Sequence, residues 1–365
     1  MMASDREKRN SSFELLRIIC MLLIVAHHYF VHGNFANPTY TGLSVEYVFL
    51  QIFSMFGRPA CTIFAMITGF FMIDSSGKNH YRKLVPIIAQ MFFYAILIVA
   101  IVCPLGVREF SLESILKGLV PIVWGNWYVK YYCVFYLFIP FINKWLKQMD
   151  KAQFKSLLII AIIVWSIIPT VTGNEWSFGE LIFFFVSYAL GAYIKLHVHG
   201  KVEYKNSRNL LVALGAVALM AILTVACDLL AIAFKENALI DGVGYLREYN
   251  IIPSLIFSVA LFLYFSNKQF SSKTINMLAS TTMGIYLIHD NDIFRPVLWN
   301  VLVPPPASGI LLVVHALVKV IVVFVVCALI DWLRAITVGK WFEKWFYYMC
   351  AKHDEKRQTD QVKQE

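Results

Sequence analysis

The chain has 365 residues, of which 59% are hydrophobic and only 15% are charged, and its mean hydropathy is +0.65. This much apolar surface is too large for a soluble core and indicates a polytopic membrane protein. The formal net charge of +9 does not indicate a nucleic-acid-binding protein, because the basic residues lie in short loops between apolar runs. We therefore expect membrane lipid, and no nucleic acid, among its partners.

Ten apolar runs are long enough to cross the hydrocarbon core of a bilayer, which is about 30 Å thick. They lie near residues 13–32, 46–73, 84–104, 127–143, 156–171, 179–196, 208–234, 250–267, 275–297 and 308–335. We predict an all-α polytopic membrane protein with about ten transmembrane helices. Its transmembrane domain spans residues 13–337, between a cytoplasmic segment over 1–12 and a cytoplasmic, partly disordered tail over 338–365.

The distribution of lysine and arginine supports this topology. Both residues accumulate in short loops on the cytoplasmic side of a membrane. With the N-terminus inside, the loops predicted to lie outside hold only Arg108, Lys117, Lys235, Arg247 and Arg295. This alternation predicts that both termini are cytoplasmic.

The cysteines argue against a metal centre. All seven lie outside any Cys-x-x-Cys pair, and most sit inside apolar runs, where cysteine behaves as a small hydrophobic residue. We predict no disulfide framework and no bound metal.

The first apolar run carries a cation and a titratable base on one face. An α-helix turns about 100° and rises about 1.5 Å per residue, so Arg17 and His28 lie within about 20° of each other and about 16 Å apart along the axis. His27 and His32 lie about 80° and 60° away. A histidine this deep in a span needs either a hydrogen bond to a neighbouring helix or a hydrated cavity.

Glu14 falls on the same face. The pattern Ser11-x-x-Glu14 is typical of a capping box, so Glu14 either caps the helix and pairs with Arg17, or takes a direct part in a site. Arg17 itself either extends to the lipid headgroups as an anchor or binds a ligand.

Three other runs place polar groups at a comparable depth. These groups are Arg58, His289, and the pair His315 and Lys319, which are four residues apart on one helix face. For Arg58, a structural ion pair is the alternative to a functional role. Together with His28, these residues predict a hydrated chamber open to the outside.

Two further sets of residues lie near the membrane surfaces. Trp127 belongs either to an interfacial aromatic belt or to a binding site, and Lys130, one turn deeper, could contact an anionic or hydroxyl-rich substrate. Arg82 and Lys83 are predicted on the same side as Arg17, either as ordinary loop charge or as phosphate ligands.

These residues resemble the membrane acyltransferase-3 family, the integral O-acyltransferases of surface glycans, over nearly the whole chain. The departures are Thr68, where a serine is usual, and a basic motif before the third span that is only approximated. The resemblance is carried by Glu14-x-x-Arg17 followed after ten residues by His28, by 57–69, by Asn126-Trp127-Tyr128 through Pro140, and by 280–289 with its Gly-Ile-Tyr-Leu-x-His element.

The resemblance implies transfer of an acyl group, most commonly acetyl, from cytoplasmic acetyl-CoA to a hydroxyl of a surface or lipid-linked glycan at the cell membrane. A neutral imidazole, with an unperturbed pKa of about 6.5, suits deprotonation of a sugar hydroxyl. On this interpretation the catalytic residues are His28, Glu14, His289 and Arg58; the donor-binding residues are Arg17, Arg82 and Lys83; and the acceptor-binding candidates are Trp127, Lys130, Tyr286, His315 and Lys319.

A transporter or flippase of a lipid-linked glycan is the main alternative, because it would also line a cavity with basic and aromatic residues. It predicts inverted repeats and no dependence on acyl-CoA. A polytopic glycosyltransferase is less favoured, because the stretches predicted outside are short.

Overall fold

The computed structural model describes residues 10–33, 35, 39–75, 80–104, 112, 116, 120–173, 179–200, 206–302 and 309–348. Every regular element in these ranges is helical, which confirms the all-α prediction. Most of the predicted N-terminal segment, at 1–9, and most of the predicted tail, at 349–365, lie outside the described residues.

Fifteen α-helices make up most of the described chain. They are α1 (Ser12–His32), α2 (Val45–Ser54), α3 (Gly57–Met72), α4 (Val85–Val102), α6 (Pro121–Trp124), α7 (Trp127–Gln148), α8 (Lys151–Ile162), α9 (Ile168–Thr172), α10 (Gly179–Tyr193), α11 (Asn206–Phe234), α12 (Ala238–Tyr245), α13 (Ile252–Ser266), α14 (Lys273–Ser280), α15 (Thr282–His289) and α16 (Ile310–Arg334). A 3-10 turn lies at His80–Leu84, and π-helical turns lie at Ile163–Ile167, Ile194–Val198, Val297–Val301 and Ala335–Gly339.

Seven helical segments within the described ranges are long and apolar enough to cross a membrane, so the chain is a polytopic membrane protein. They are Ser12–His32, Val45–Met72, Arg82–Val102, Lys151–Thr172, Gly179–Val198, Asn206–Phe234 and Ile310–Tyr348.

The other three predicted spans fall on α7, on α13, and on α14 with α15. Helix α7 carries three lysines, α13 has only 15 residues, and Thr281 separates α14 from α15. None of the three is therefore a long uninterrupted apolar helix. The total of ten spans and the cytoplasmic position of the termini stay predictions.

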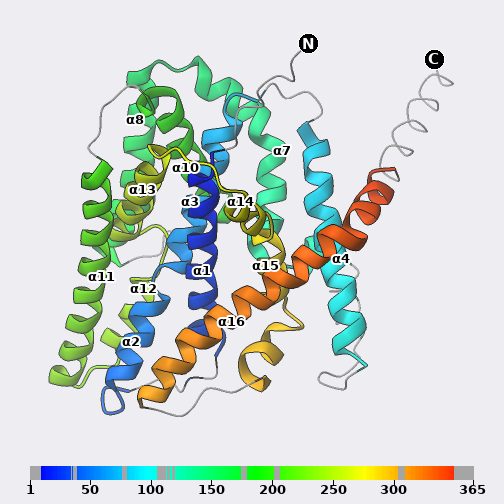
Figure 1. Ribbon diagram of the computed structural model, residues 1–365. Coiled ribbons are helices and arrows are strands. Elements are labelled where there is room, and N and C mark those ends of the chain that lie inside the picture. The colour runs from blue at the N-terminus through cyan, green and yellow to red at the C-terminus, as the bar shows by residue number, and fades with distance from the viewer. Residues whose placement is uncertain are drawn as a thin grey trace.

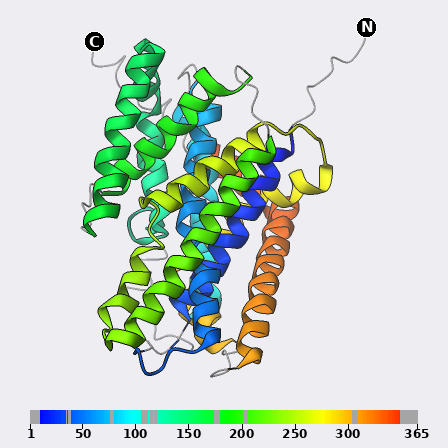
Figure 2. The same ribbon diagram turned by 90° about the vertical axis from the view of Figure 1, so that its left-hand side faces the viewer.

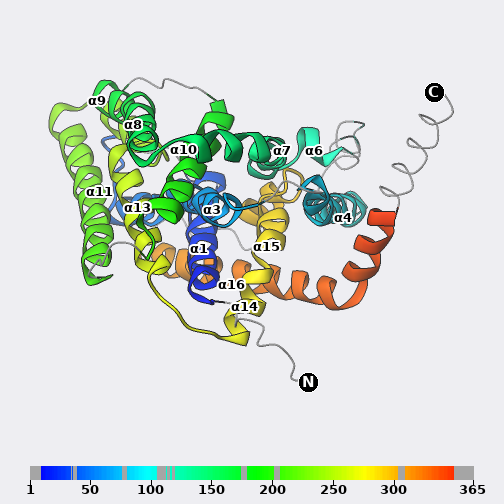
Figure 3. The ribbon, with the colours of Figure 1, turned by 90° about the horizontal axis from the view of Figure 1, so that it is seen from above.

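Helix α1 lies near the centre of the bundle. Seen from above, α1 and α3 are surrounded by α10, α13, α15 and α16 (Figure 3). The turned view shows that the long helices run in roughly one direction, as helices that cross one bilayer do (Figure 2). The start of α1 and the end of α16 lie at the same end of the bundle (Figure 1).

Two glycines allow α3 and α10 to approach closely. A Cβ atom on Gly69 would lie 2.0 Å from the carbonyl oxygen of Tyr188, and one on Gly191 would lie 2.0 Å from the carbonyl oxygen of Met66. Small residues permit this kind of backbone contact between membrane helices. The contact fixes α3, which carries one wall of the site.

The predicted capping box at the start of α1 is wrong. The Ser11 side chain makes no capping hydrogen bond. Instead its Oγ donates to Asn276 Oδ1 at 2.8 Å, and its backbone N–H donates to the carbonyl oxygen of Phe270 at 2.7 Å. The Ser11 hydroxyl therefore bonds to a distant part of the chain, whereas the predicted pair of Glu14 with Arg17 is present.

Candidate active site

One face of α1 lines two adjacent cavities. Its members are Glu14, Arg17, Met21, Ile24 and His28, spaced by three or four residues, which keeps them on one side of the helix. The alignment of Arg17 and His28 expected from helix geometry is present, and each residue lines a different cavity.

The first cavity lies at the end where α1 begins and has a volume of about 260 Å³. Arg17 and Glu14 are its charged lining residues within the described part of the chain, and apolar and aromatic side chains form most of the rest. Arg17 Nη1 donates to Glu14 Oε1 at 2.7 Å. A guanidinium has five N–H donors, so this pairing leaves Arg17 able to bind another anion.

The second cavity lies toward the other end of α1 and has a volume of about 280 Å³. Its lining is much more polar than that of the first. The polar and aromatic members are His27, His28, His32, Arg58, Trp127, Glu180, Tyr249, Tyr286, Asp290 and Arg295.

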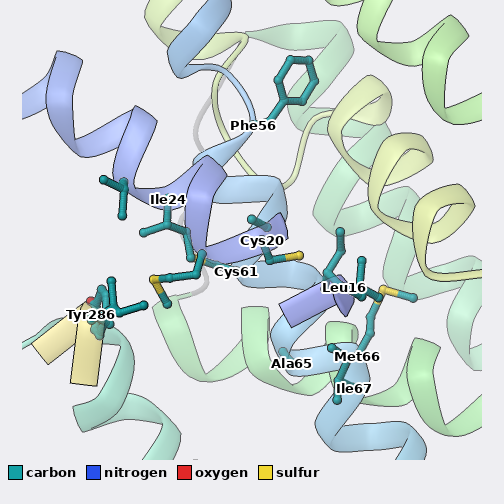
Figure 4. Packing of buried hydrophobic residues seen from close by; sticks show 14 of the residues in the cluster. Leu16, Cys20, Ile24, Phe56, Cys61, Ala65, Met66, Ile67 and Tyr286 are labelled. Carbon is teal, nitrogen blue, oxygen red and sulfur yellow. The ribbon is translucent and has the colours of Figure 1, made fainter. Parts of the chain in front are cut away.

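A thin partition separates the two cavities. Ile24, Cys61 and Tyr286 line both of them. Figure 4 shows these side chains coming from three helices, Ile24 from α1, Cys61 from α3 and Tyr286 from α15. The Tyr286 ring centroid lies 6.3 Å from that of His28. The partition is therefore next to the buried histidine.

His28 is held by a second histidine. Its Nδ1 lies 2.9 Å from Nε2 of His289, and Nδ1 of His289 lies 2.6 Å from the carbonyl oxygen of Ile285. A carbonyl oxygen only accepts hydrogen bonds, so His289 Nδ1 must carry a proton, and the Nε2 of neutral His289 is then an acceptor. His28 Nδ1 therefore donates, and its Nε2 is left unprotonated, in the form that a general base requires.

Asp290 is placed to stabilise a positive charge on His28. Its Oδ1 lies 3.7 Å from His28 Nδ1 and 3.5 Å from His32 Nε2. Arg295 Nη1 reaches the same oxygen at 3.2 Å, and the Asn126 side-chain amide donates to the backbone carbonyl oxygen of Asp290 at 2.7 Å and to its carboxylate Oδ2 at 3.3 Å. The carboxylate is thus fixed beside the imidazole from several sides.

His28, His32 and Asp290 also have the composition of a metal site, and their candidate ligand atoms lie within 4.8 Å of one another. Two of these groups also have other partners. His28 Nδ1 donates to His289, and the Asp290 oxygen contacts Arg295.

Arg58 lines the second cavity and forms an ion pair with Glu248. Its side chain remains 43% exposed. The structural ion pair that was the alternative to a functional role for Arg58 is therefore present. The same guanidinium also lines the cavity that His28 lines.

Of three residues predicted to bind the acceptor, two line the second cavity and one does not. Trp127 lines the second cavity, and Tyr286 lines both. Lys130 is half-buried and lies over the ring of Tyr131, 5.1 Å from its centroid, outside both linings.

The expectation of one chamber built from four helices is wrong in one respect. His315 and Lys319 line a separate apolar groove of about 660 Å³ along α16. His315 Nδ1 lies 2.8 Å from the Tyr29 hydroxyl, and Lys319 Nζ donates to the carbonyl oxygens of Trp299 and Leu302 at 3.2 and 2.9 Å. These carbonyl oxygens belong to the π-helical turn Val297–Val301 and to the residue after it. The sequence pattern did not predict this turn.

The basic pair before α4 lies away from the first cavity. Arg82 donates to the Tyr347 hydroxyl at 3.1 Å, Lys83 is exposed, and neither residue lines the cavity.

Sequence reasoning missed several residues of the second cavity. Glu180 and Tyr249 face it from α10 and from the segment before α13, and His32 reaches Asp290 although it lies off the Arg17–His28 face. Glu180 carried a usable signal, because an acidic residue in an apolar run is costly without a function.

A helical membrane domain with two adjacent cavities, one of them lined by a buried histidine that bonds to a second histidine, defines a polytopic membrane protein suited to proton-transfer chemistry. Residues 10–332 match the family model described as an acyltransferase domain, and the chain belongs to this acyltransferase-3 family, as the sequence resemblance predicted. The protein is therefore a membrane acyltransferase. Neither the curated proteins nor the solved structures compared with it give a match.

Proposed function

We propose that the protein is an O-acyltransferase of the cell membrane that moves an acetyl group from cytoplasmic acetyl-CoA to a hydroxyl of a surface or lipid-linked glycan. The observation that carries this proposal is the position of His28 beside a partition between two cavities, one near Arg17 and one rich in polar groups. A donor and an acceptor that approach from opposite ends of α1 would meet there.

The first cavity is the proposed donor site. Arg17 would bind phosphate groups of the CoA nucleotide through its remaining donors, and Glu14 would orient its guanidinium. Arg82 and Lys83 would attract the same anion from outside the cavity. The pantetheine arm would follow the α1 face toward Ile24, a path of about 16 Å between Arg17 and His28.

The second cavity is the proposed acceptor site, and His28 is the proposed general base. Nε2 of His28 takes the proton of the sugar hydroxyl as its oxygen attacks the thioester carbonyl carbon. The C–S bond then breaks, and the CoA thiolate recovers the proton from His28. Asp290 stabilises the transient imidazolium, His289 holds the tautomer, and Arg58 supports the negative charge that develops on the carbonyl oxygen.

The ester content of cell-surface glycan tests this function. Mild alkali should release acetate from glycan of cells that carry the protein, and much less from isogenic cells without it. Membranes from the first cells should transfer labelled acetyl from acetyl-CoA to glycan. Equal acetate release and no dependence on acetyl-CoA would instead favour a transporter of lipid-linked glycan.

A further inference from the structure

The cations of the second cavity are already neutralised. Arg58 pairs with Glu248, and Arg295 pairs with Asp290 at 3.2 Å and with Asp292 at 3.0 Å. The carboxylate partners offset the attraction of these two guanidinium groups for an anionic ligand.

Glu180 adds a carboxylate that forms no salt bridge among the described residues, although the Arg58 charge acts on it from a distance. Its Oε2 accepts a hydrogen bond from the Tyr249 hydroxyl at 3.3 Å. It lines the cavity and is half-buried. A carboxylate oxygen held in this way is a good acceptor for sugar hydroxyl or ammonium groups and repels an anion.

Among the described residues, arginines do not outnumber carboxylates at this cavity. Arg58 and Arg295 line it together with Glu180 and Asp290. The ion-pair partners Glu248 and Asp292 and the neighbouring Arg247 bring the totals to four carboxylates and three arginines. Arg247 stacks over the Phe30 ring at 4.8 Å, outside the lining.

Two aromatic side chains provide apolar surface in the same cavity. Trp127 and Tyr249 both line it. The Tyr249 ring is fixed between Trp165, at a centroid distance of 5.7 Å, and Phe183, at 4.4 Å. The negative face of an aromatic ring attracts weakly positive C–H groups, such as those on the face of a sugar ring.

We propose that the second cavity selects a neutral or amino-bearing sugar as the acyl acceptor and rejects a sugar that carries a carboxylate, sulfate or phosphate near the reacting hydroxyl. This inference rests on the proposed acyl transfer and specifies the substrate class of its acceptor site. Glu180 accepts a hydrogen bond from the sugar, and Trp127 contacts its apolar face.

The position of the ester in glycan tests the proposal. Surface and lipid-linked glycans are isolated from cells expressing the wild-type protein or His28→Ala, and alkali-labile acetyl groups are assigned to sugar residues by mass spectrometry and NMR. The His28-dependent ester should lie on a neutral or amino sugar. An ester on an acidic sugar would overturn the inference and leave the transferase function standing, whereas no His28-dependent ester would overturn the function itself.

A second variant tests the role of Glu180. Glu180→Gln keeps the shape of the side chain and removes its charge, and should lower the ester content of glycan by roughly tenfold or more, because hydrogen bonds to charged groups contribute about 1.5–3 kcal/mol. Exposed Glu236→Gln, outside the cavity, is the matched control. Folding is checked by monodisperse elution in detergent and by retained acetyl-CoA binding. Unchanged ester content in folded Glu180→Gln would contradict the proposal.

Discussion

His28 and His289 share one hydrogen bond, 2.9 Å long, whose direction is set by a third group, the carbonyl oxygen of Ile285. This chain fixes a proton on His28 Nδ1 and exposes a lone pair on its Nε2. The geometry parallels that of a serine protease triad, in which a carboxylate holds the base in one tautomer.

Replacement of His28 should remove the chemical step. We expect His28→Ala and His28→Gln to lower acetyl transfer by about 10²–10⁴-fold, the usual contribution of a general base. The measurement is transfer of labelled acetyl from acetyl-CoA to glycan in isolated membranes. His199→Ala, outside both cavities, is the control and should retain full activity. Normal transfer by folded His28→Ala would eliminate this residue as the base.

Replacement of His289 should remove the hydrogen bond that keeps the proton on His28 Nδ1, and should leave the donor site intact. We expect His289→Ala to lower kcat by about a hundredfold, in line with the loss caused by a misplaced catalytic group, with little change in KM for acetyl-CoA. His289→Gln should restore part of the rate, because its side-chain carbonyl can accept from His28 Nδ1. Equal kcat values for the two variants would argue against the tautomer role.

The partition should respond to the size of residue 61. Cys61→Phe should block the passage and abolish transfer while acetyl-CoA still binds, because the new ring would fill the space between Ile24 and Tyr286. Cys61→Ala is the matched small variant and should remain active. Binding is followed by equilibrium titration of the purified proteins. Full activity of Cys61→Phe would show that the acyl group takes another route.

Arg17 should act on donor affinity. Loss of a charged hydrogen bond of about 1.5–3 kcal/mol predicts a rise in KM for acetyl-CoA of about 10- to 100-fold in Arg17→Ala. Arg17→Lys should be intermediate, because lysine keeps the charge without the planar fork. The control is Arg208→Ala at the exposed start of α11. A fall in kcat at unchanged KM would place Arg17 in the chemical step.

Gly284 should be required for stability. A Cβ at this position would lie 2.1 Å from Asp331 Cγ, and Asp331 accepts hydrogen bonds from Tyr94, Gln90 and Arg334 at 2.7–2.8 Å. Gly284→Ala should destabilise the fold by about 1–3 kcal/mol through overpacking. Thermal unfolding in detergent measures the effect, and Gly215→Ala, which has open space around its Cβ, should not lower the midpoint.

Helical periodicity was enough to predict the α1 face. The residues on one face depend only on the 3.6-residue repeat within one helix. The alignment of Arg17 with His28 could therefore be calculated from their eleven-residue separation in the sequence. The family resemblance used these residues together with the motifs at 57–69, 126–140 and 280–289. His289 could be placed at a comparable depth for the same reason, since depth depends on distance along a span.

Rotation about a helix axis could not be predicted in the same way. His315 and Lys319 lie at a suitable depth, but they face a groove on α16, because packing against neighbouring helices sets that rotation. Ser11 illustrates a similar limit, since its partner Asn276 lies 265 residues away in the chain. Local patterns do not reveal which distant group will compete for a side chain.

One turn of α15 performs two separate tasks. Ile285 supplies the carbonyl that fixes the proton on His289, and the next residue, Tyr286, closes the partition between the cavities. A shift of the whole helix to admit the donor arm would carry Ile285 and His289 together and break the hydrogen bond between His289 and His28. Rotation of the Tyr286 side chain alone would open the passage and keep the base ready. We therefore expect α15 to stay still during turnover, with the aromatic ring as its moving part.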